Sequence, residues 1–260
     1  RRRVRFVWKP KMTAINRPDA LLDDLARASR ILEMEGHGDM TLGHLSLRDP
    51  GGRGLWLKRN AAGLGEIAGP DDFILIDFDG NKLAGEGGCH SEWVIHSEIL
   101  RLRPDIEVVA HTHPFHACVF SASPDPLLPF TVDADYFAEL PRHESTAALI
   151  NTPELGADLA KGLGPTAYAI MMANHGVTFC GTSIPHATMI GVFLEHACRA
   201  HVVGLSSGMR CVFPSAEERA LRHSQIMQPT HISHSWNFYI RHLSAREASL
   251  AHRASLPTQG

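Results

Sequence analysis

Histidine is the residue type that points most directly to chemistry in this chain. Seventeen of the 260 residues are histidines, against 25 lysines and arginines together. His111 and His113 are separated by one residue and follow the apolar run 108–110. Because side chains alternate along a strand, both histidines are expected to point to the same side of it. Neutral imidazole is a common ligand of divalent metal ions, so this pair predicts part of a metal site.

A third protein ligand is expected from another segment, since catalytic metal sites commonly take three and leave a position open. His175 is the best candidate, because it ends a second apolar run, 169–173, and precedes Gly176, which allows a sharp backbone turn. A chance His-X-His in a histidine-rich chain is the competing interpretation. Together the three histidines predict one divalent ion per chain, and zinc, manganese and cobalt all suit such ligands.

Glu92 is the candidate acid or base of this site. It stands in the first turn of a predicted helix that begins at Ser91, with Ser91 as a possible N-cap. A carboxylate beside a metal can accept or donate a proton during a reaction. The competing interpretation is an acidic residue that stabilises a helix N-terminus by about 0.3–1 kcal/mol. From composition alone, that second interpretation is the stronger one.

The spacing of apolar residues predicts the elements that position these groups. Helices are expected over about 18–35, 91–103, 152–163 and 185–203. Strands are expected over 41–48, 55–58, 73–77, 82–84, 108–113 and 169–173, with Asp79-Gly80 as a two-residue hairpin turn. Hairpins and helices are mixed without regular βαβ repetition. An α/β sandwich with a mixed sheet is therefore favoured over a doubly wound fold.

Composition argues against several classes of partner. A net charge of −3 gives no excess of basic residues, so nucleic acid is not expected as a ligand. No apolar stretch approaches the roughly 20 residues of a membrane span, and no secretory signal is recognisable, so no membrane partner and a cytoplasmic location are expected. The five cysteines are scattered without a CxxC pair, which is typical of reduced thiols.

Five separated segments, taken in order, resemble the class II aldolase/adducin family over roughly residues 20 to 205. They are Gly43-His44-Leu45-Ser46, Gly65-Glu66-Ile67 before Asp71-Asp72-Phe73, Ser91-Glu92-Trp93-Val94-Ile95-His96, His111-Thr112-His113-Pro114 and Asn174-His175-Gly176. The resemblance implies a three-layer α/β/α sandwich with a central mixed, largely antiparallel sheet. It also implies a homotetramer with active sites at subunit interfaces. Residues 1–17 are interpreted as an N-terminal arm, and 18–260 as one domain with a helical C-terminal tail.

The resemblance also assigns roles to residues of the site. His111, His113 and His175 match the metal ligands of the family, and Glu92 matches its acid/base carboxylate. Family enzymes such as fuculose phosphate aldolase use a tyrosine donated by a neighbouring subunit, and Tyr136 lies in a comparable place after the His-X-His segment. A packed surface aromatic is the alternative interpretation of Tyr136, with equal weight.

The segments that bind phosphate in sugar-phosphate aldolases of the family are not matched here. The corresponding places read Gly43-His44, Leu57-Lys58-Arg59-Asn60 and His90-Ser91. Lys58 and Arg59 could instead bind a carboxylate, since guanidinium holds one in bidentate fashion. With His44 and Ser91, they form the predicted substrate-binding set. The alternative for Lys58 and Arg59 is a pair of exposed charges after an edge strand.

The function predicted from these residues is that of a metal-dependent carbon–carbon lyase. It would act on a small hydroxylated, carboxylate-bearing substrate through a metal-stabilised enolate. Aldol cleavage and decarboxylation have nearly equal weight, because relatives within the family do either with the same metal arrangement. Two alternatives remain: a metal-dependent dehydratase or epimerase, and an adducin-like binding module. Adducin-like members lack the histidine triad, which favours an enzyme.

Overall fold

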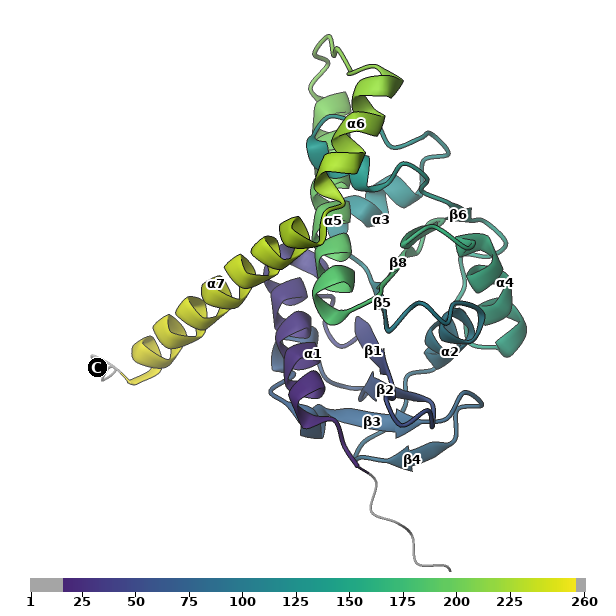
Figure 1. Ribbon diagram of the computed structural model, residues 1–260, viewed down its shortest axis with the longest axis vertical. Coiled ribbons are helices and arrows are strands. Elements are labelled where there is room, and N and C mark those ends of the chain that lie inside the picture. Colours follow the sequence, from purple (N-terminus) through teal and green to yellow (C-terminus); the bar gives the residue numbers. More distant parts are fainter. Residues whose placement is uncertain (1–15, 256–260) are drawn as a thin grey trace, which may run out of the picture.

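The computed structural model describes residues 16–255 of the chain. Residues 1–15, which make up most of the predicted N-terminal arm, and residues 256–260 lie outside the described part (Figure 1).

Within residues 16–255, one sheet holds eight strands in the order β4-β3-β2-β1-β5-β8-β7-β6. The strands are β1 (His44–Arg48), β2 (Leu55–Lys58), β3 (Phe73–Ile76), β4 (Lys82–Ala84), β5 (Val108–Thr112), β6 (Arg142–His143), β7 (Ala169–Met172) and β8 (Gly176–Gly181). Strands β6 and β7 pair in parallel, and all the other neighbours are antiparallel. The prediction of a mixed, largely antiparallel sheet is therefore confirmed.

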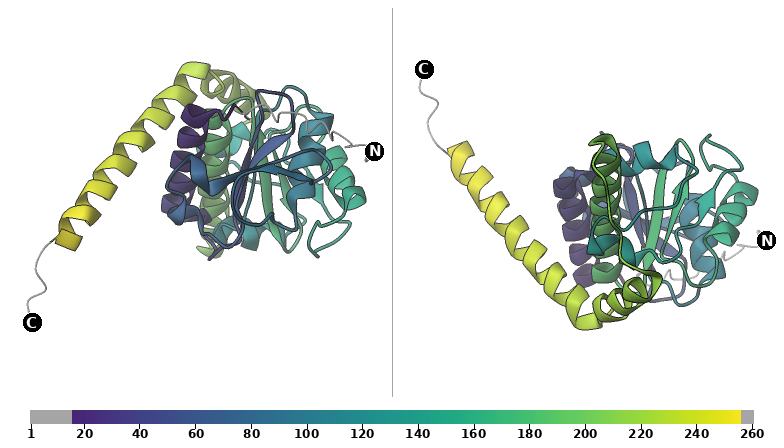
Figure 2. Two further views of the ribbon diagram at one scale, coloured as in Figure 1. Left: turned by 90° about the horizontal axis from the view of Figure 1, so that it is seen from below. Right: turned by 90° about the horizontal axis from the view of Figure 1, so that it is seen from above.

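Helices cover both faces of the sheet and give the three layers that were predicted (Figure 2). Helices α1 (Asp19–Leu32) and α5 (Ile184–Ser206) cover one face, and α2 (Trp93–Leu102) and α4 (Pro153–Leu163) cover the other. Helix α3 (Phe115–Ser121) packs on α5, and α6 (Ala216–Ile226) packs on the short turn Val132–Tyr136. The fold is an α/β sandwich of three layers.

The alternation of side chains along the central strands determines which side chains point to each face of the sheet. On β5, Val108 and Ala110 join the core formed with α1 and α5, whereas Val109 joins the core formed with α2 and α4. His111 follows the same alternation and points to the α2 and α4 side. Strand β1 runs beside β5 with His44 opposite His111, so both histidines share that face.

Three local predictions need correction. Strand β8 was not predicted, although it follows β7 through a tight turn and pairs with both β7 and β5. The connection between β3 and β4 spans residues 77–81, so Asp79-Gly80 is not a two-residue turn. Helix α2 begins at Trp93, and the N-cap position belongs to Glu92, not to Ser91. The Glu92 carboxylate makes no capping hydrogen bond, which leaves it available for the site.

Helix α7 (Pro229–Ser255) runs away from the body of the protein (Figures 1 and 2). Its first half packs on α1 and α5 through Ile232, Trp236, Tyr239 and Leu243. Farther along, Arg30 on α1 donates to the Glu247 carboxylate at 2.8 Å. Among residues 16–255, none of the helices combines the length and the apolar character needed to span a bilayer.

Candidate metal centre

Three histidines lie close together at the ends of neighbouring inner strands of the sheet. His111 is on β5, His113 directly follows β5, and His175 lies in the turn between β7 and β8. Their nearest ring nitrogens all lie within 4.8 Å of one another. The Nε2 atoms of His111 and His113 are only 3.0 Å apart. The antiparallel pairing of β5 with β8 produces this meeting, because the end of β5 then lies beside the start of β8.

Each of the three imidazoles is held by an oxygen atom at Nδ1. His111 Nδ1 donates to the carbonyl of Val177 at 3.1 Å, and His175 Nδ1 donates to the carbonyl of Ala147 at 3.2 Å. His113 Nδ1 donates to the Asp39 carboxylate, also at 3.1 Å. Because carbonyl and carboxylate oxygens only accept, each ring carries a proton on Nδ1. This is the arrangement by which metal-binding histidines are usually oriented.

The protonation state of these rings fits a cation at their centre. Burial lowers the pKa of His111 well below its ordinary value, and the neighbouring His113 lowers it further. Burial and the neighbouring His175 also lower the pKa of His113. Neutral His111 and His113 rings with the proton on Nδ1 turn their unprotonated Nε2 atoms toward each other, and these lone pairs repel across 3.0 Å. A divalent ion relieves that repulsion, so the three residues fit the metal that was predicted.

Glu92 lies beside the triad and is nearly buried. Its two carboxylate oxygens are each 3.8 Å from a histidine nitrogen, one from His111 Nε2 and the other from His175 Nε2. One of these oxygens also accepts a hydrogen bond from the backbone N–H of Ile150 at 2.8 Å. Burial raises the pKa of Glu92, against the opposing effect of the Ile150 N–H. A carboxyl group with a raised pKa beside a cation site is suited to proton transfer.

The turn that presents His175 depends on two neighbouring residues. Asn174 adopts the left-handed conformation, with φ of 57°, and so makes the sharp turn that was assigned to Gly176. Gly176 is required for a different reason. A Cβ atom there would lie 2.5 Å from His113 Cδ2 and 2.7 Å from the carbonyl oxygen of Thr112. The glycine therefore allows β8 to lie close to the end of β5.

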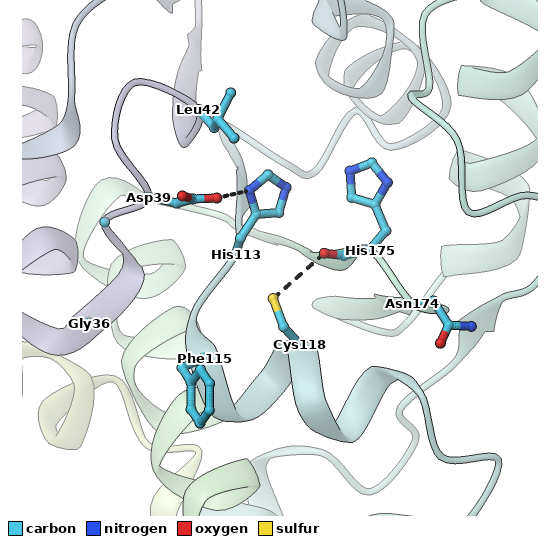
Figure 3. Close-up of a pocket in the computed structure, with 9 residues that line it drawn as sticks. Gly36, Asp39, Leu42, His113, Phe115, Cys118, Asn174 and His175 are labelled. Atoms are coloured by element: carbon cyan, nitrogen blue, oxygen red, sulfur yellow. Dashed lines mark hydrogen bonds and ion pairs between the residues drawn. The ribbon is translucent and has the colours of Figure 1, made fainter.

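A pocket of about 590 Å³ opens beside His113 and His175 (Figure 3). Its wall also includes Leu42, Phe115 and Cys118, and none of the described residues that line it is a lysine or an arginine. Leu42 is 46% exposed and Phe115 is 70% exposed. The Cys118 thiol donates to the carbonyl of His175, and burial raises its pKa to about 11. The pocket therefore offers apolar surface next to the metal ligands.

His44 is the one predicted substrate-binding residue that the structure brings next to the triad. Its ring centroid is 5.3 Å from that of His111 and 4.4 Å from that of His90. Its Nδ1 lies 2.6 Å from Nε2 of His96, a buried residue on α2. His44, His90 and His96 thus continue the cluster of histidines away from the metal ligands, between the sheet and the start of α2.

The Lys58 side chain leaves β2 on the face opposite His44, yet its charge acts on this cluster and, in addition to burial, helps to lower the pKa of His44 and of His90. It alternates with Leu57 on β2 and shares the face of Trp56, on the side of the sheet opposite His44. The lysine is fully buried in an inner strand, so its description as an exposed charge after an edge strand is wrong. Its ammonium donates to the backbone carbonyls of Arg59 and Ala62, and burial lowers its pKa to about 8.

Arg59 and Ser91 are also separate from the triad pocket. Arg59 Nε donates to the Asp72 carboxylate at 2.9 Å, and its side chain is about one-third exposed. Ser91 is exposed in the turn before α2. Neither residue is among those that line the pocket beside His113 and His175. Their roles in substrate binding stay predictions.

Tyr136 is buried within its own chain. Its hydroxyl lies 2.6 Å from His231 Nδ1 and donates to the carbonyl of Ile226 at 3.2 Å. Its ring stacks on Phe193 with a centroid distance of 4.4 Å. Tyr136 is not among the residues that line the triad pocket of the same chain. Its predicted catalytic role depends on a neighbouring subunit and stays a prediction.

Asp39 is the site residue that the sequence did not reveal. It lies in the loop between α1 and β1, 74 positions before the histidine that it holds. The segment Gly38-Asp39-Met40 has no spacing relation to any other part of the site. The roles of the backbone groups of Ala147, Ile150 and Val177 could not be predicted from the sequence either. Every residue type has a backbone carbonyl, and all but proline have a backbone N–H, so the residue type gives no signal for such a contact.

Comparison with known proteins gives consistent matches. A sequence profile of the Class II Aldolase and Adducin N-terminal domain matches residues 23–202. The 3,4-dihydroxyphthalate decarboxylase of Arthrobacter keyseri is 28% identical, over 66% of this chain and 73% of that protein. A solved structure of an aldolase II superfamily protein from Pseudomonas syringae is 28% identical and superimposes with a TM-score of 0.78, covering 87% and 93% of the two chains. An L-fuculose 1-phosphate aldolase from Glaciozyma antarctica shares the fold, with a TM-score of 0.77 at 22% identity over 88% and 90%.

Proposed function

Because the chain belongs to the class II aldolase and adducin family, we propose that it is a metal-dependent carbon–carbon lyase for a small hydroxylated carboxylic acid. The observation that supports this most directly is the meeting of three Nε2 atoms, each freed by an oxygen partner at Nδ1, beside the buried carboxyl of Glu92. A binding module has no need of converging lone pairs or of a buried carboxyl group, both of which cost stability.

His111, His113 and His175 would hold the ion, which could be zinc, manganese or cobalt. When bound, a divalent ion supplies Lewis-acid stabilisation of negative charge on a substrate oxygen. Asp39 holds the His113 ring in the orientation that keeps Nε2 toward the centre. The Ile150 N–H fixes the Glu92 carboxyl beside both His111 and His175.

In the proposed reaction on a hydroxylated aromatic acid, Glu92, whose pKa is raised by burial, donates a proton to the ring carbon that bears the carboxylate, while the neighbouring hydroxyl loses its proton to solvent. The bond from that carbon to the carboxylate then breaks, carbon dioxide leaves, and the bonding electron pair restores the aromatic ring as a phenolate. Solvent protonates the phenolate and Glu92 again. In aldol cleavage, the Glu92 carboxylate would instead take the proton of the hydroxyl on the carbon that leaves as an aldehyde, and would return it to the enolate carbon.

The pocket favours decarboxylation of an acid with an apolar body. Phe115 and Leu42 present exposed apolar surface beside the triad, and the described lining has no lysine or arginine to neutralise a phosphate. A hydroxylated aromatic acid matches both properties. The Arthrobacter relative is by its name a decarboxylase of such an acid, which supports the same choice.

We also propose that the pocket is completed by a second copy of the chain, as in the homotetramer that the family implies. Phe115 and Leu42 both line the pocket and are 70% and 46% exposed, and large exposed apolar side chains at a pocket are typical of surfaces that a partner covers. Light scattering of the purified protein tests this, since a monomer at micromolar concentration would contradict it.

The test of the proposed lyase begins with the metal content of the purified protein. About one ion per chain is expected in the wild type and much less in His113→Ala, with little change in the circular dichroism spectrum. Release of carbon dioxide from a panel of hydroxylated aromatic acids should then stop on addition of a chelator and return with metal. Release of an aldehyde from sugar phosphates would assign aldol cleavage. Turnover that survives in metal-free His113→Ala would overturn the proposal.

A further inference from the structure

The loop between β6 and α4, residues 144–152, supplies two backbone groups to the metal centre. The Ala147 carbonyl accepts from His175 Nδ1 at 3.2 Å, and the Ile150 N–H donates to the Glu92 carboxylate at 2.8 Å. One contact orients an expected metal ligand, and the other holds the proposed proton donor. The position of this loop therefore affects both parts of the site.

Few contacts of its own side chains hold this loop. The chain is irregular over 144–152, and Ala147, Ala148 and Leu149 are exposed. Strand β6, from which the loop leaves, is two residues long and lies at the end of the sheet. Segments with few buried side chains open more easily than the body of a protein. A loop that keeps two groups in place thus needs an attachment to a more rigid element.

Asp158 on α4 provides that attachment. Its Oδ2 atom accepts from Ser145 Oγ at 2.7 Å and from His143 Nε2 at 3.0 Å. These two hydrogen bonds lower the pKa of Asp158, so the carboxylate is ionised and only accepts. His143 is buried at the end of β6, and its carbonyl accepts from the Ala173 N–H at 3.0 Å. One carboxylate oxygen therefore joins both the loop and the strand before it to α4.

Helix α4 is in turn fixed against the helix that begins at the site. Leu159 of α4 is buried in the core that this helix shares with α2 (Figure 1). The two helices approach closely at Gly156, where a Cβ atom would lie 2.8 Å from the carbonyl oxygen of Val94. Val94 is two residues after Glu92, the N-cap residue of α2. Asp158 therefore has a fixed position relative to Glu92.

We propose that Asp158 is a positioning residue of the metal centre, which acts through the loop 144–152 on His175 and Glu92. Without its carboxylate, the loop would shift, and the His175 ring and the Glu92 carboxyl would each lose a backbone partner. The Asp158 side chain is 51% exposed and lies outside the lining of the triad pocket, so it does not act on the substrate directly. The effect on Glu92 rests on the proposed lyase, whereas the effect on His175 needs only metal binding.

A pair of variants at Asp158 separates position from charge. Asp158→Leu removes the acceptor of both hydrogen bonds. Asp158→Asn keeps one oxygen, and because both bonds end on the same oxygen atom, the amide oxygen can accept them both. Ile99→Val is the matched control for stability, since it weakens the core shared by α2 and α4 and leaves the contacts of Asp158 in place.

Two measurements need no substrate. The first is amide hydrogen exchange of the peptide that contains Ile150, followed by mass spectrometry in metal-free protein. In Asp158→Leu this peptide should exchange faster, because the loop opens more often. The second is a zinc titration, in which the dissociation constant of Asp158→Leu should rise about tenfold, the lower end of what loss of a partner of a metal-binding histidine costs. Asp158→Asn and Ile99→Val should stay close to the wild type in both.

Turnover at saturating zinc tests the effect on Glu92. In Asp158→Leu, kcat for release of carbon dioxide should fall about tenfold with little change in KM, because the proton donor and not the substrate loses a partner. Asp158→Asn should restore most of this loss. If the wild type turns over none of the hydroxylated aromatic acids, the lyase proposal fails for these acids, and hydrogen exchange and zinc affinity still decide the role of Asp158.

Unchanged exchange and zinc affinity in Asp158→Leu would overturn the proposal. Equal losses in Asp158→Asn and Asp158→Leu would assign the effect to the lost charge, and an equal loss in Ile99→Val would assign it to stability; both results contradict the positioning role. If Asp158→Leu does not fold, Ser145→Ala removes one of the two hydrogen bonds. It should show the same changes at smaller size, and wild-type behaviour there would also overturn the proposal.

Discussion

Replacing Glu92 by glutamine isolates the proton transfer from the rest of the site. The glutamine amide has nearly the same shape as the carboxyl, and its oxygen can still accept from the Ile150 N–H, which lies 2.8 Å from the Glu92 carboxylate. The three metal ligands are unchanged. The amide has no proton of suitable acidity, so the variant should bind metal and substrate and fail at protonation.

The size of the loss follows from what else could deliver the proton. A positioned acid or base is typically worth 10²–10⁴-fold in rate, or about 3–5 kcal/mol of the barrier. The Cys118 thiol has a pKa raised to about 11 by burial, and Asp39 is hydrogen-bonded to His113. His113 and His175 are the expected metal ligands. Because Asp39 is engaged with His113 and the thiol is a weak acid, neither is placed to replace Glu92, and we expect kcat to fall by about 10³-fold.

The assay is steady-state release of carbon dioxide by metal-loaded protein, with metal content measured on the same samples. Glu98→Gln is the matched control, because Glu98 lies on the same helix, pairs with Arg101 and should leave kcat unchanged. If Glu92→Gln retains its metal and a kcat within tenfold of the wild type, Glu92 is not the proton donor and this interpretation of the site is wrong.

Three further outcomes are expected. Asp39→Asn should weaken metal affinity 10–100-fold in a metal titration, because the His113 ring loses its carboxylate partner. Gly176→Ala should lower the free energy of unfolding by about 1–3 kcal/mol in urea and also reduce metal content, because its Cβ would overlap His113. The ion pair of His196 with Glu35 raises the pKa of His196, so its contribution to stability is complete below pH 6.5 and is lost as pH rises through the raised pKa.

Each of these predictions has a control. Asp39→Asn should leave kcat at saturating metal nearly unchanged, and a large loss there would place Asp39 in the chemistry. Gly69→Ala has its nearest neighbour at 3.6 Å and should be close to wild type. For the ion pair, thermal melts from about pH 6 to 9 should show a small decline that disappears in His196→Gln. A decline of equal size in that variant would assign it to another group.

The sequence by itself determined those parts of the site that depend on local pattern. The apolar run before His111 and His113 predicts a buried strand, and the alternation of side chains puts both rings on one side of it. The spacing of apolar residues also located α1, α2, α4 and α5 to within a few residues. Such features depend on residues that are close in the sequence, so they can be predicted before the tertiary structure is known.

Other features of the site depend on the tertiary structure and could not be predicted from local sequence. Lys58 and His44 were both placed in the predicted substrate-binding set, but the alternation of side chains along β1 and β2 directs them to opposite faces of the sheet. Strand β8 escaped prediction because Val177, Phe179 and Cys180 are too few to give a clear period. Its pairing with β5 is nevertheless what brings His175 to His113.

The protonation of the histidine rings in the site is also determined by the tertiary structure. A histidine in a sequence has no assigned proton, and its pKa depends on burial and on partners that come from other segments. Asp39 and the carbonyl groups of Val177 and Ala147 fix the three Nδ1 atoms, and α2 places His96 against His44. Residue types and local spacing thus specified which groups could bind a metal, whereas contacts between distant segments decided which nitrogen of each ring is free to do so.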